Sequence, residues 1–231
     1  MNKFRKYARH IIPFLFILTI PLLGVLYSLT DNSEHNVHSL TTLLDYNTPY
    51  LKIFILPYIA WYPYLLVSYI FLCISDRKAY YVTLTSYNVC LIVSNIIFFC
   101  YQTTVPRPIN IGHDWLNNIV SWVYQHDRPF DCFPSIHVIG CYLVMKGVCH
   151  SQIRQRIARL IIYLVGTTII VSTLFVKQHV LFDVIGGILI VEVVFLIISM
   201  IYTRMRTSKF KWRTHQGDRQ NRYKNSRKQF G

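Results

Sequence analysis

Six mostly apolar stretches, separated by short polar connections, dominate the first 203 residues. A helix needs about 20 apolar residues to cross the hydrocarbon core of a bilayer. Backbone polar groups must be satisfied inside lipid, so these stretches are expected to be helices. The expected spans are residues 11–29, 51–75, 80–101, 136–148, 159–176 and 180–202. The fourth is short, and its crossing depends on including Phe133 and Pro134 or on a tilt. The pattern therefore predicts an all-α, polytopic membrane bundle with six transmembrane helices.

Composition supports a membrane protein, because 53% of the residues are hydrophobic and only 15% are charged. The apolar pattern ends near residue 203, so residues 1–203 are expected to form one membrane domain. Residues 204–231 are expected to be a basic, disordered tail.

The net charge of +14 is concentrated at the two ends of the chain. Ten of the 24 Lys and Arg residues lie between Arg204 and Lys228, and four more precede residue 11. Basic ends that flank apolar spans indicate membrane orientation. Nucleic-acid binding is disfavoured because its recognition motifs are missing from the sequence.

Charge in the connections predicts the orientation of the bundle. The connection at residues 30–50 has no Lys or Arg, whereas basic residues occur at 77–78 and at 154–159. Basic connections stay in the cytoplasm, so both termini are expected there. The regions 30–50, 102–135 and 177–179 would then lie together on the extracytoplasmic face.

Cysteine spacing gives no support for a metal site. The six cysteines are scattered and form no Cys-x-x-Cys or Cys/His pattern typical of zinc, so no metal and no cofactor is expected. Most of these cysteines lie in or beside apolar stretches and are expected to be free thiols.

The three extracytoplasmic regions carry the residues with reactive side chains. His179 and Asp183 are four residues apart and would share one helical face. A carboxylate there can hold the proton of one imidazole nitrogen and leave the other nitrogen free to attack. His137, from a different helix, can protonate a leaving oxygen, and Arg107 can bind phosphate oxygens through its planar fork.

Further anion contacts are expected around these four residues. Ser135 stands where the fourth helix would begin, and exposed N–H groups at a helix start favour anions. Lys177 lies two residues before His179 and is a third possible phosphate contact. Ser135 as a simple helix cap and Lys177 as an interfacial anchor are the alternatives.

In order and spacing, these residues resemble the motifs of the type 2 phosphatidic acid phosphatase (PAP2) superfamily. That family has a Lys, six residues and Arg-Pro; then Pro-Ser-Gly-His; then Ser-Arg, five residues, His, three residues and Asp. The chain has Arg107-Pro108, Pro134-Ser135-Ile136-His137, and Ser172 followed by His179 and Asp183. The resemblance implies a histidine-dependent lipid phosphatase or phosphotransferase, with Ser172 among the phosphate-binding residues.

The chain departs from the family pattern at three positions. Cys100 stands in place of the family's Lys, Ile136 in place of its Gly, and Thr173 in place of its Arg. Two cations are therefore missing, and Lys177 is a hypothetical replacement for one of them. Fewer cations weaken the binding of a doubly charged phosphate monoester, which leaves room for a diester substrate.

The expected function is hydrolysis of a phosphate monoester or diphosphate on a lipid through a phosphohistidine intermediate. Phosphatidate, phosphatidylglycerol phosphate and polyprenyl diphosphate types are all compatible with the resemblance. A headgroup phosphotransferase of the phosphosphingolipid-synthase type is one alternative, and a non-enzymatic transporter or scaffold is another. The expected partners are a lipid phosphate substrate and the bilayer, while the oligomeric state stays open.

Two further features bear on these alternatives. Glu192 lies inside the sixth span, where an acid is costly, and a paired packing role is favoured over transport. Residues 114–125 have apolar positions at helical spacing and are expected to form a short helix in the membrane interface.

Overall fold

The computed structural model describes residues 13–30, 37–109, 112 and 114–229. Its long helices are α2 (Thr19–Thr30), α5 (Trp61–Ser75), α6 (Arg77–Cys100), α8 (Ile136–Cys149), α9 (Arg156–Phe175) and α10 (Leu181–Gln229). Shorter helices are η1 (Phe16–Leu18), α3 (Leu43–Asn47), η2 (Lys52–Phe54), α4 (Ile55–Ile59) and α7 (Trp115–His126). Two short strands, β1 (His38–Ser39) and β2 (Thr103–Thr104), pair in parallel. The described part of the chain is thus mostly helical, as the sequence predicts.

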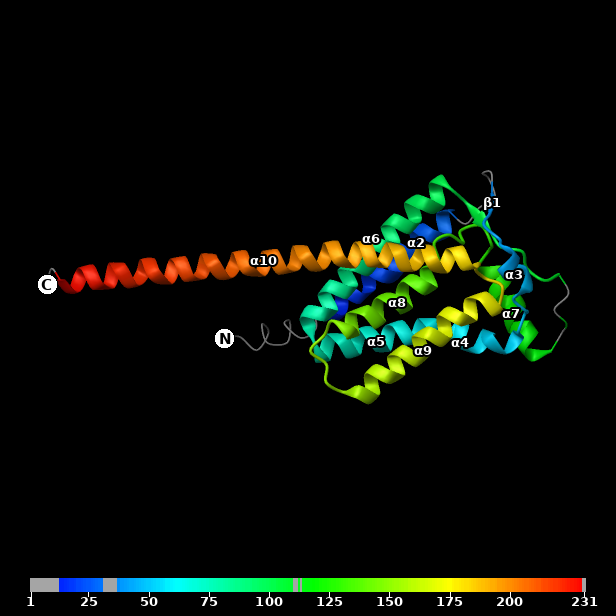
Figure 1. Cartoon of the computed structure of the whole chain (residues 1–231), viewed down its shortest axis with the longest axis horizontal. Helices are drawn as coiled ribbons and strands as arrows, with labels where there is room; N and C mark the ends of the chain where they lie inside the picture. The colour runs from blue at the N-terminus through cyan, green and yellow to red at the C-terminus, as the bar shows by residue number, and fades with distance from the viewer. Residues whose placement is uncertain (1–12, 31–36, 110–111, 113, 230–231) are drawn as a thin grey trace. The chain divides into compact units, whose positions relative to one another are not determined.

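Helix α8 is the centre of the bundle. It packs against α5, α6 and α9, while α2 packs against α6 (Figure 1). Most of the α8 side chains are buried, among them Val138, Ile139, Leu143 and Val144, each fully covered. The helix that carries His137 is therefore held on several sides.

Polar side chains mark the starts of three helices. Asp76 accepts hydrogen bonds from the first backbone N–H groups of α6, and Asp114 does the same for α7. Ser135 accepts from the N–H of Val138 at the start of α8. Each cap satisfies donors that have no partner within their own helix.

Four of the six expected spans are confirmed as helices long and apolar enough to cross a membrane: Lys52–Ser75, Arg77–Cys100, Arg156–Phe175 and Leu181–Met205. The other two correspond to shorter apolar helices, Pro13–Val25 and Ile136–Cys149. Residues 11 and 12 of the first expected span lie outside the described residues. The 14 residues of α8 rise about 21 Å, less than the hydrocarbon thickness of about 30 Å. Six complete crossings therefore stay a prediction.

The basic segment after residue 203 continues as helix, because α10 runs to Gln229 without a proline to interrupt it. The secondary structure alone does not test the disordered tail that the sequence predicts there, which stays a prediction. By its internal contacts the chain divides into one unit at residues 1–195 and a second at residues 196–231. The domain boundary predicted at residue 203 is not decided by this division.

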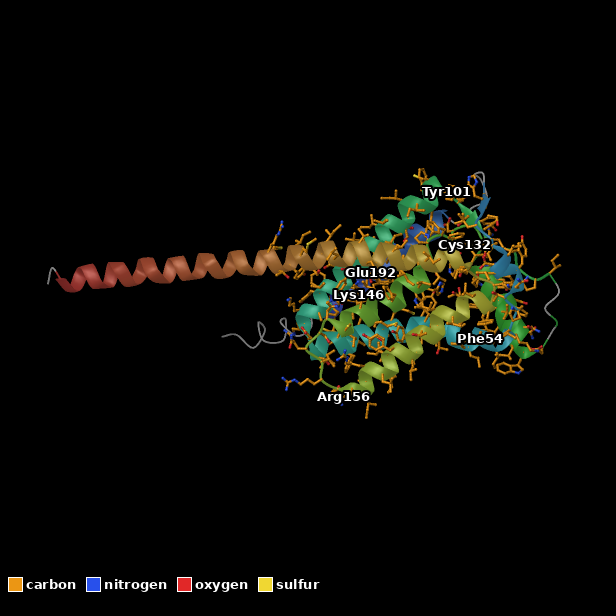
Figure 2. The ribbon with its side chains drawn as sticks, in the orientation of Figure 1. Phe54, Tyr101, Cys132, Lys146, Arg156 and Glu192 are labelled. Carbon is orange, nitrogen blue, oxygen red and sulfur yellow. The ribbon has the colours of Figure 1, made fainter. Side chains whose placement is uncertain are left out.

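Glu192 is paired, as the sequence analysis favours. Its carboxylate forms an ion pair with Lys146 of α8 and accepts a hydrogen bond from the Tyr142 hydroxyl. Figure 2 labels Lys146 and Glu192 beside each other, away from the end of the bundle where Phe54 and Cys132 lie. The pair links α8 to α10 and lies roughly two and a half turns after His137 on α8 and roughly three turns into α10.

One end of the bundle is covered by short elements. Helices α3, α4 and α7 lie at the end where α9 passes into α10 (Figure 1). Apolar side chains of α4 and α7, together with Val176 after α9, form a small buried cluster of Ile55, Tyr58, Leu116, Val120, Val123 and Val176. The predicted helix at residues 114–125 is confirmed as α7, and its place in the membrane interface remains a prediction.

Candidate active site

His179 and Asp183 form a buried pair at the start of α10. His179 Nδ1 lies 3.3 Å from Asp183 Oδ2, and the backbone N–H of Val180 donates to the same oxygen over 2.9 Å. The His179 side chain is 7% exposed and that of Asp183 is 0% exposed. A carboxylate in this place favours a proton on Nδ1, which leaves a lone pair on Nε2 of His179.

His137 faces this lone pair from α8. Its Nδ1 lies 3.4 Å from His179 Nε2, and the two ring centroids are 5.5 Å apart. Two aromatic rings flank the His137 imidazole, with centroids 4.6 Å away for Tyr58 and 4.4 Å away for Trp61. The structure thus brings together the two histidines and the aspartate that the sequence singles out.

Close packing of α8 on α10 makes this distance possible. A Cβ atom on Gly186 would lie 2.3 Å from the Phe133 ring, and one on Gly187 would lie 3.1 Å from the carbonyl oxygen of Ser135. The backbone N–H of Ser135 also donates to the carbonyl of Asp183 over 3.2 Å. The absence of a side chain at these two glycines therefore allows the close contact.

Arg107 reaches the same region from the loop after β2. Its Nη1 donates to the carbonyl of Tyr124 (3.1 Å) and its Nη2 to the carbonyl of Asp127 (2.7 Å). Nη2 also bonds to Oε1 of Gln178, the residue before His179. The guanidinium lies over the Tyr124 ring, 4.3 Å from its centroid. Four contacts thus fix the orientation of this cation.

Two buried donors next to His179 have no partner among the described residues. They are Arg107 Nε and Gln178 Nε2, and the Gln178 side chain is only 3% exposed. A buried polar group without a hydrogen bond costs about 1–3 kcal/mol. A bound acceptor such as a phosphate oxygen would give these two donors a partner.

Lys177 points away from these donors. Its backbone is left-handed, with φ 56°, and its Nζ donates to the carbonyl of Asp45 over 2.6 Å. Asp45 is buried, and its Oδ1 accepts from the N–H of Leu181 over 2.8 Å. Burial lowers the pKa of Lys177, while the Asp45 carboxylate opposes that shift. This bond holds residues 37–50 onto the turn before α10, and the phosphate contact suggested for Lys177 stays a prediction.

The two serines of the motifs are engaged in their own helices. Ser135 Oγ accepts from the N–H of Val138 over 3.4 Å, which is the helix-cap alternative. Ser172 is fully buried, and its hydroxyl donates to the carbonyl of Ile169 over 2.6 Å. Thr173, at the position of a family cation, likewise bonds back to Ile170. Cys100 is exposed at the end of α6.

Several residues beside the histidines were not anticipated from the sequence. Asp45 shows one local signal, a capping box with Thr42 that starts α3, but nothing in it predicts contact with Lys177 or Leu181. Tyr58 and Trp61 look like ordinary apolar positions of a span. Gln178 stands at a position that the third motif leaves unspecified. Within the described ranges, no group of three or more His, Cys, Asp or Glu residues is arranged to hold a metal ion.

Comparison with protein families supplies the remaining observation. Residues 83–207 match the PAP2 superfamily. This range includes Arg107 and the row of His137, His179 and Asp183. The chain belongs to the PAP2 superfamily. No curated protein and no solved structure matches it. PAP2 members are generally phosphatases, so phosphatase-type chemistry is assigned to this protein at that level.

Proposed function

We propose that this PAP2 protein is a membrane lipid phosphatase that works through a phosphohistidine on His179. The observation that carries the proposal is the buried row of Asp183, His179 and His137, joined at 3.3 and 3.4 Å. A nucleophile oriented by a carboxylate, with a second imidazole beside it, is the minimum set for covalent phosphoryl transfer.

In the first step, His179 Nε2 attacks the phosphorus and the bond from phosphorus to the lipid oxygen breaks. His137 gives a proton to that oxygen, so the lipid leaves as an alcohol. Where the substrate is a lipid diphosphate, the product is the lipid monophosphate. Asp183 accepts the Nδ1 proton of His179 in a hydrogen bond and stabilises the positive charge that develops on the ring. Arg107 stabilises the negative charge on the phosphoryl oxygens.

In the second step, His137 takes a proton from water, and the resulting hydroxide attacks the phosphorus. The bond between phosphorus and His179 Nε2 breaks and inorganic phosphate leaves. Both histidines then have their starting protonation. The proposed site lies at the extracytoplasmic face, with both termini in the cytoplasm.

A headgroup phosphotransferase is the second candidate. It is favoured by the loss of two family cations at Cys100 and Thr173, which weakens the attraction for a doubly charged monoester. In that reaction an acceptor alcohol replaces water in the second step.

A lipid panel with wild-type protein and His179→Asn protein tests the proposal. Purified full-length protein in detergent is given phosphatidate, phosphatidylglycerol phosphate, polyprenyl diphosphate, and a phospholipid diester with an acceptor alcohol. We expect phosphate release from a monoester or diphosphate and none from the variant. New headgroup-exchanged lipid without phosphate release would favour the transferase. Equal phosphate release by His179→Asn protein would remove the proposed nucleophile.

A further inference from the structure

We propose that Gln178 is a phosphate-binding residue of this site and that its amide N–H group acts together with Arg107 Nε. The proposal rests on the proposed function, and it assigns one donor of the phosphate cradle. Gln178 is the last of the five residues that the family's third motif leaves unspecified before His179.

The orientation of the Gln178 amide follows from its neighbour. Arginine has only donors, so the amide group that meets Arg107 Nη2 is the oxygen Oε1. The NH₂ group of Gln178 is then directed to the other side, and no described residue accepts from it. Gln178 is only 3% exposed, so bulk water does not accept a hydrogen bond from this NH₂ group as it would from an amide at the surface.

Arg107 also has a donor without a described partner, in the same guanidinium that bonds to Gln178. The Nε–H of a planar guanidinium and one N–H of Nη2 point in the same direction, and Nη2 is the nitrogen bonded to Gln178. Arg107 Nε has no partner among the described residues. One charged and one neutral donor, on two side chains joined by a hydrogen bond, therefore both lack an acceptor among the described residues.

Gln178 is a chain neighbour of the proposed nucleophile. Gln178 directly precedes His179, whose Nε2 lies 3.4 Å from His137. An oxygen bound by both donors would belong to a phosphoryl group within reach of His179. The amide supplies a contact in a chain that has Thr173 and Cys100 at two family cation positions.

Two substitutions separate binding of phosphate from support of Arg107. Gln178→Glu keeps an oxygen for Arg107 Nη2 but removes the amide donor. Gln178→Met removes both contacts at similar length. Gln125→Glu is the matched control, because Gln125 is an exposed residue of α7 and receives the same change of charge.

The first measurement is the rise in melting temperature of the full-length protein with added inorganic phosphate, which needs no turnover. We expect Gln178→Glu and Gln178→Met to weaken phosphate binding by about 10-fold or more, the usual cost of losing a bond to a charged group. The Gln125→Glu protein should bind phosphate as the wild type does. Phosphate binding by Gln178→Met that equals wild type would overturn the proposal.

The second measurement is steady-state kinetics on whichever lipid the wild type hydrolyses. We expect the KM of Gln178→Glu to rise while its melting temperature without phosphate stays at the wild-type value. A fall in melting temperature and kcat for both variants, with phosphate affinity retained, would show that Gln178 only supports Arg107 and would also overturn the proposal. Wild-type protein that binds phosphate through Gln178 but hydrolyses no lipid would refute the proposed function alone.

Discussion

His179 Nε2 faces His137 Nδ1 at 3.4 Å, a distance that leaves no room for a phosphoryl group between the two rings. Attack requires about 3–3.5 Å between nitrogen and phosphorus, and the leaving oxygen must lie a further hydrogen bond from His137. Productive binding therefore separates these two nitrogens, and the phosphoryl group takes the place of their contact.

Replacing His137 should separate the two chemical steps. With a good leaving group such as p-nitrophenyl phosphate, His137→Gln protein should still form the phosphohistidine but release phosphate about 100- to 10,000-fold more slowly, because water has lost its base. Acid-labile, alkali-stable phosphoprotein should accumulate and be detected on a gel. His179→Asn protein is the control and should show none. Rapid phosphate release by His137→Gln protein would contradict the role given to His137.

Asp183→Asn should reduce kcat with little change in KM. The amide keeps the shape of the side chain but can no longer favour the Nδ1 proton of His179, and the equivalent change in a Ser-His-Asp triad costs about 10⁴-fold. The rate of phosphohistidine formation measures this effect directly. An Asp183→Asn protein with normal kcat would show that Asp183 serves only the backbone N–H of Val180.

Gly186→Ala should move the start of α8 away from α10. The added carbon would meet the Phe133 ring at 2.3 Å, and overpacking of this kind costs about 1–3 kcal/mol. We expect a lower melting temperature and a lower kcat, both partly restored in the double variant with Phe133→Leu. Gly24→Ala is the control, because nothing lies within 4 Å of its added carbon. Equal behaviour of the two alanine variants would refute the packing argument.

Lys177→Met should affect stability more than phosphate affinity. It removes the hydrogen bond from Nζ to the Asp45 carbonyl, a contact worth about 1–2 kcal/mol. We expect a lower melting temperature with an unchanged inhibition constant for inorganic phosphate. Lys78→Met, an exposed residue of α6, is the matched control. A large loss of phosphate affinity in Lys177→Met protein would return Lys177 to the phosphate site.

The sequence predicts those parts of the site that depend on local spacing. His179 and Asp183 are four residues apart, so the first turn of a helix is enough to bring them together. Apolar runs of sufficient length likewise predict α5, α6, α9 and the first part of α10. Apolar length does not predict a full crossing for α8, because its 14 residues are fewer than the roughly 20 that a span needs.

The rest of the site depends on backbone direction and on partners distant in sequence. The left-handed φ of Lys177 sends its side chain to Asp45, whereas the next residue turns to Arg107. Motif spacing treats both positions as neighbours of His179 and gives no means of telling them apart. Gln178 and Asp45 meet partners 71 and 136 residues away, and one sequence contains no periodicity that reports such contacts.

The contacts of Gly187 and Asp183 with Ser135 connect the nucleophile and the proton donor through main chain. Gly187 lies bare against the Ser135 carbonyl, and the Asp183 carbonyl accepts from the Ser135 N–H. Helices that touch through their backbones move relative to each other as rigid units, whereas a flexible side chain can move independently. The distance between the two imidazoles therefore depends on how α8 and α10 pack together. A tilt of either helix would change that distance and, with it, the rate of the reaction.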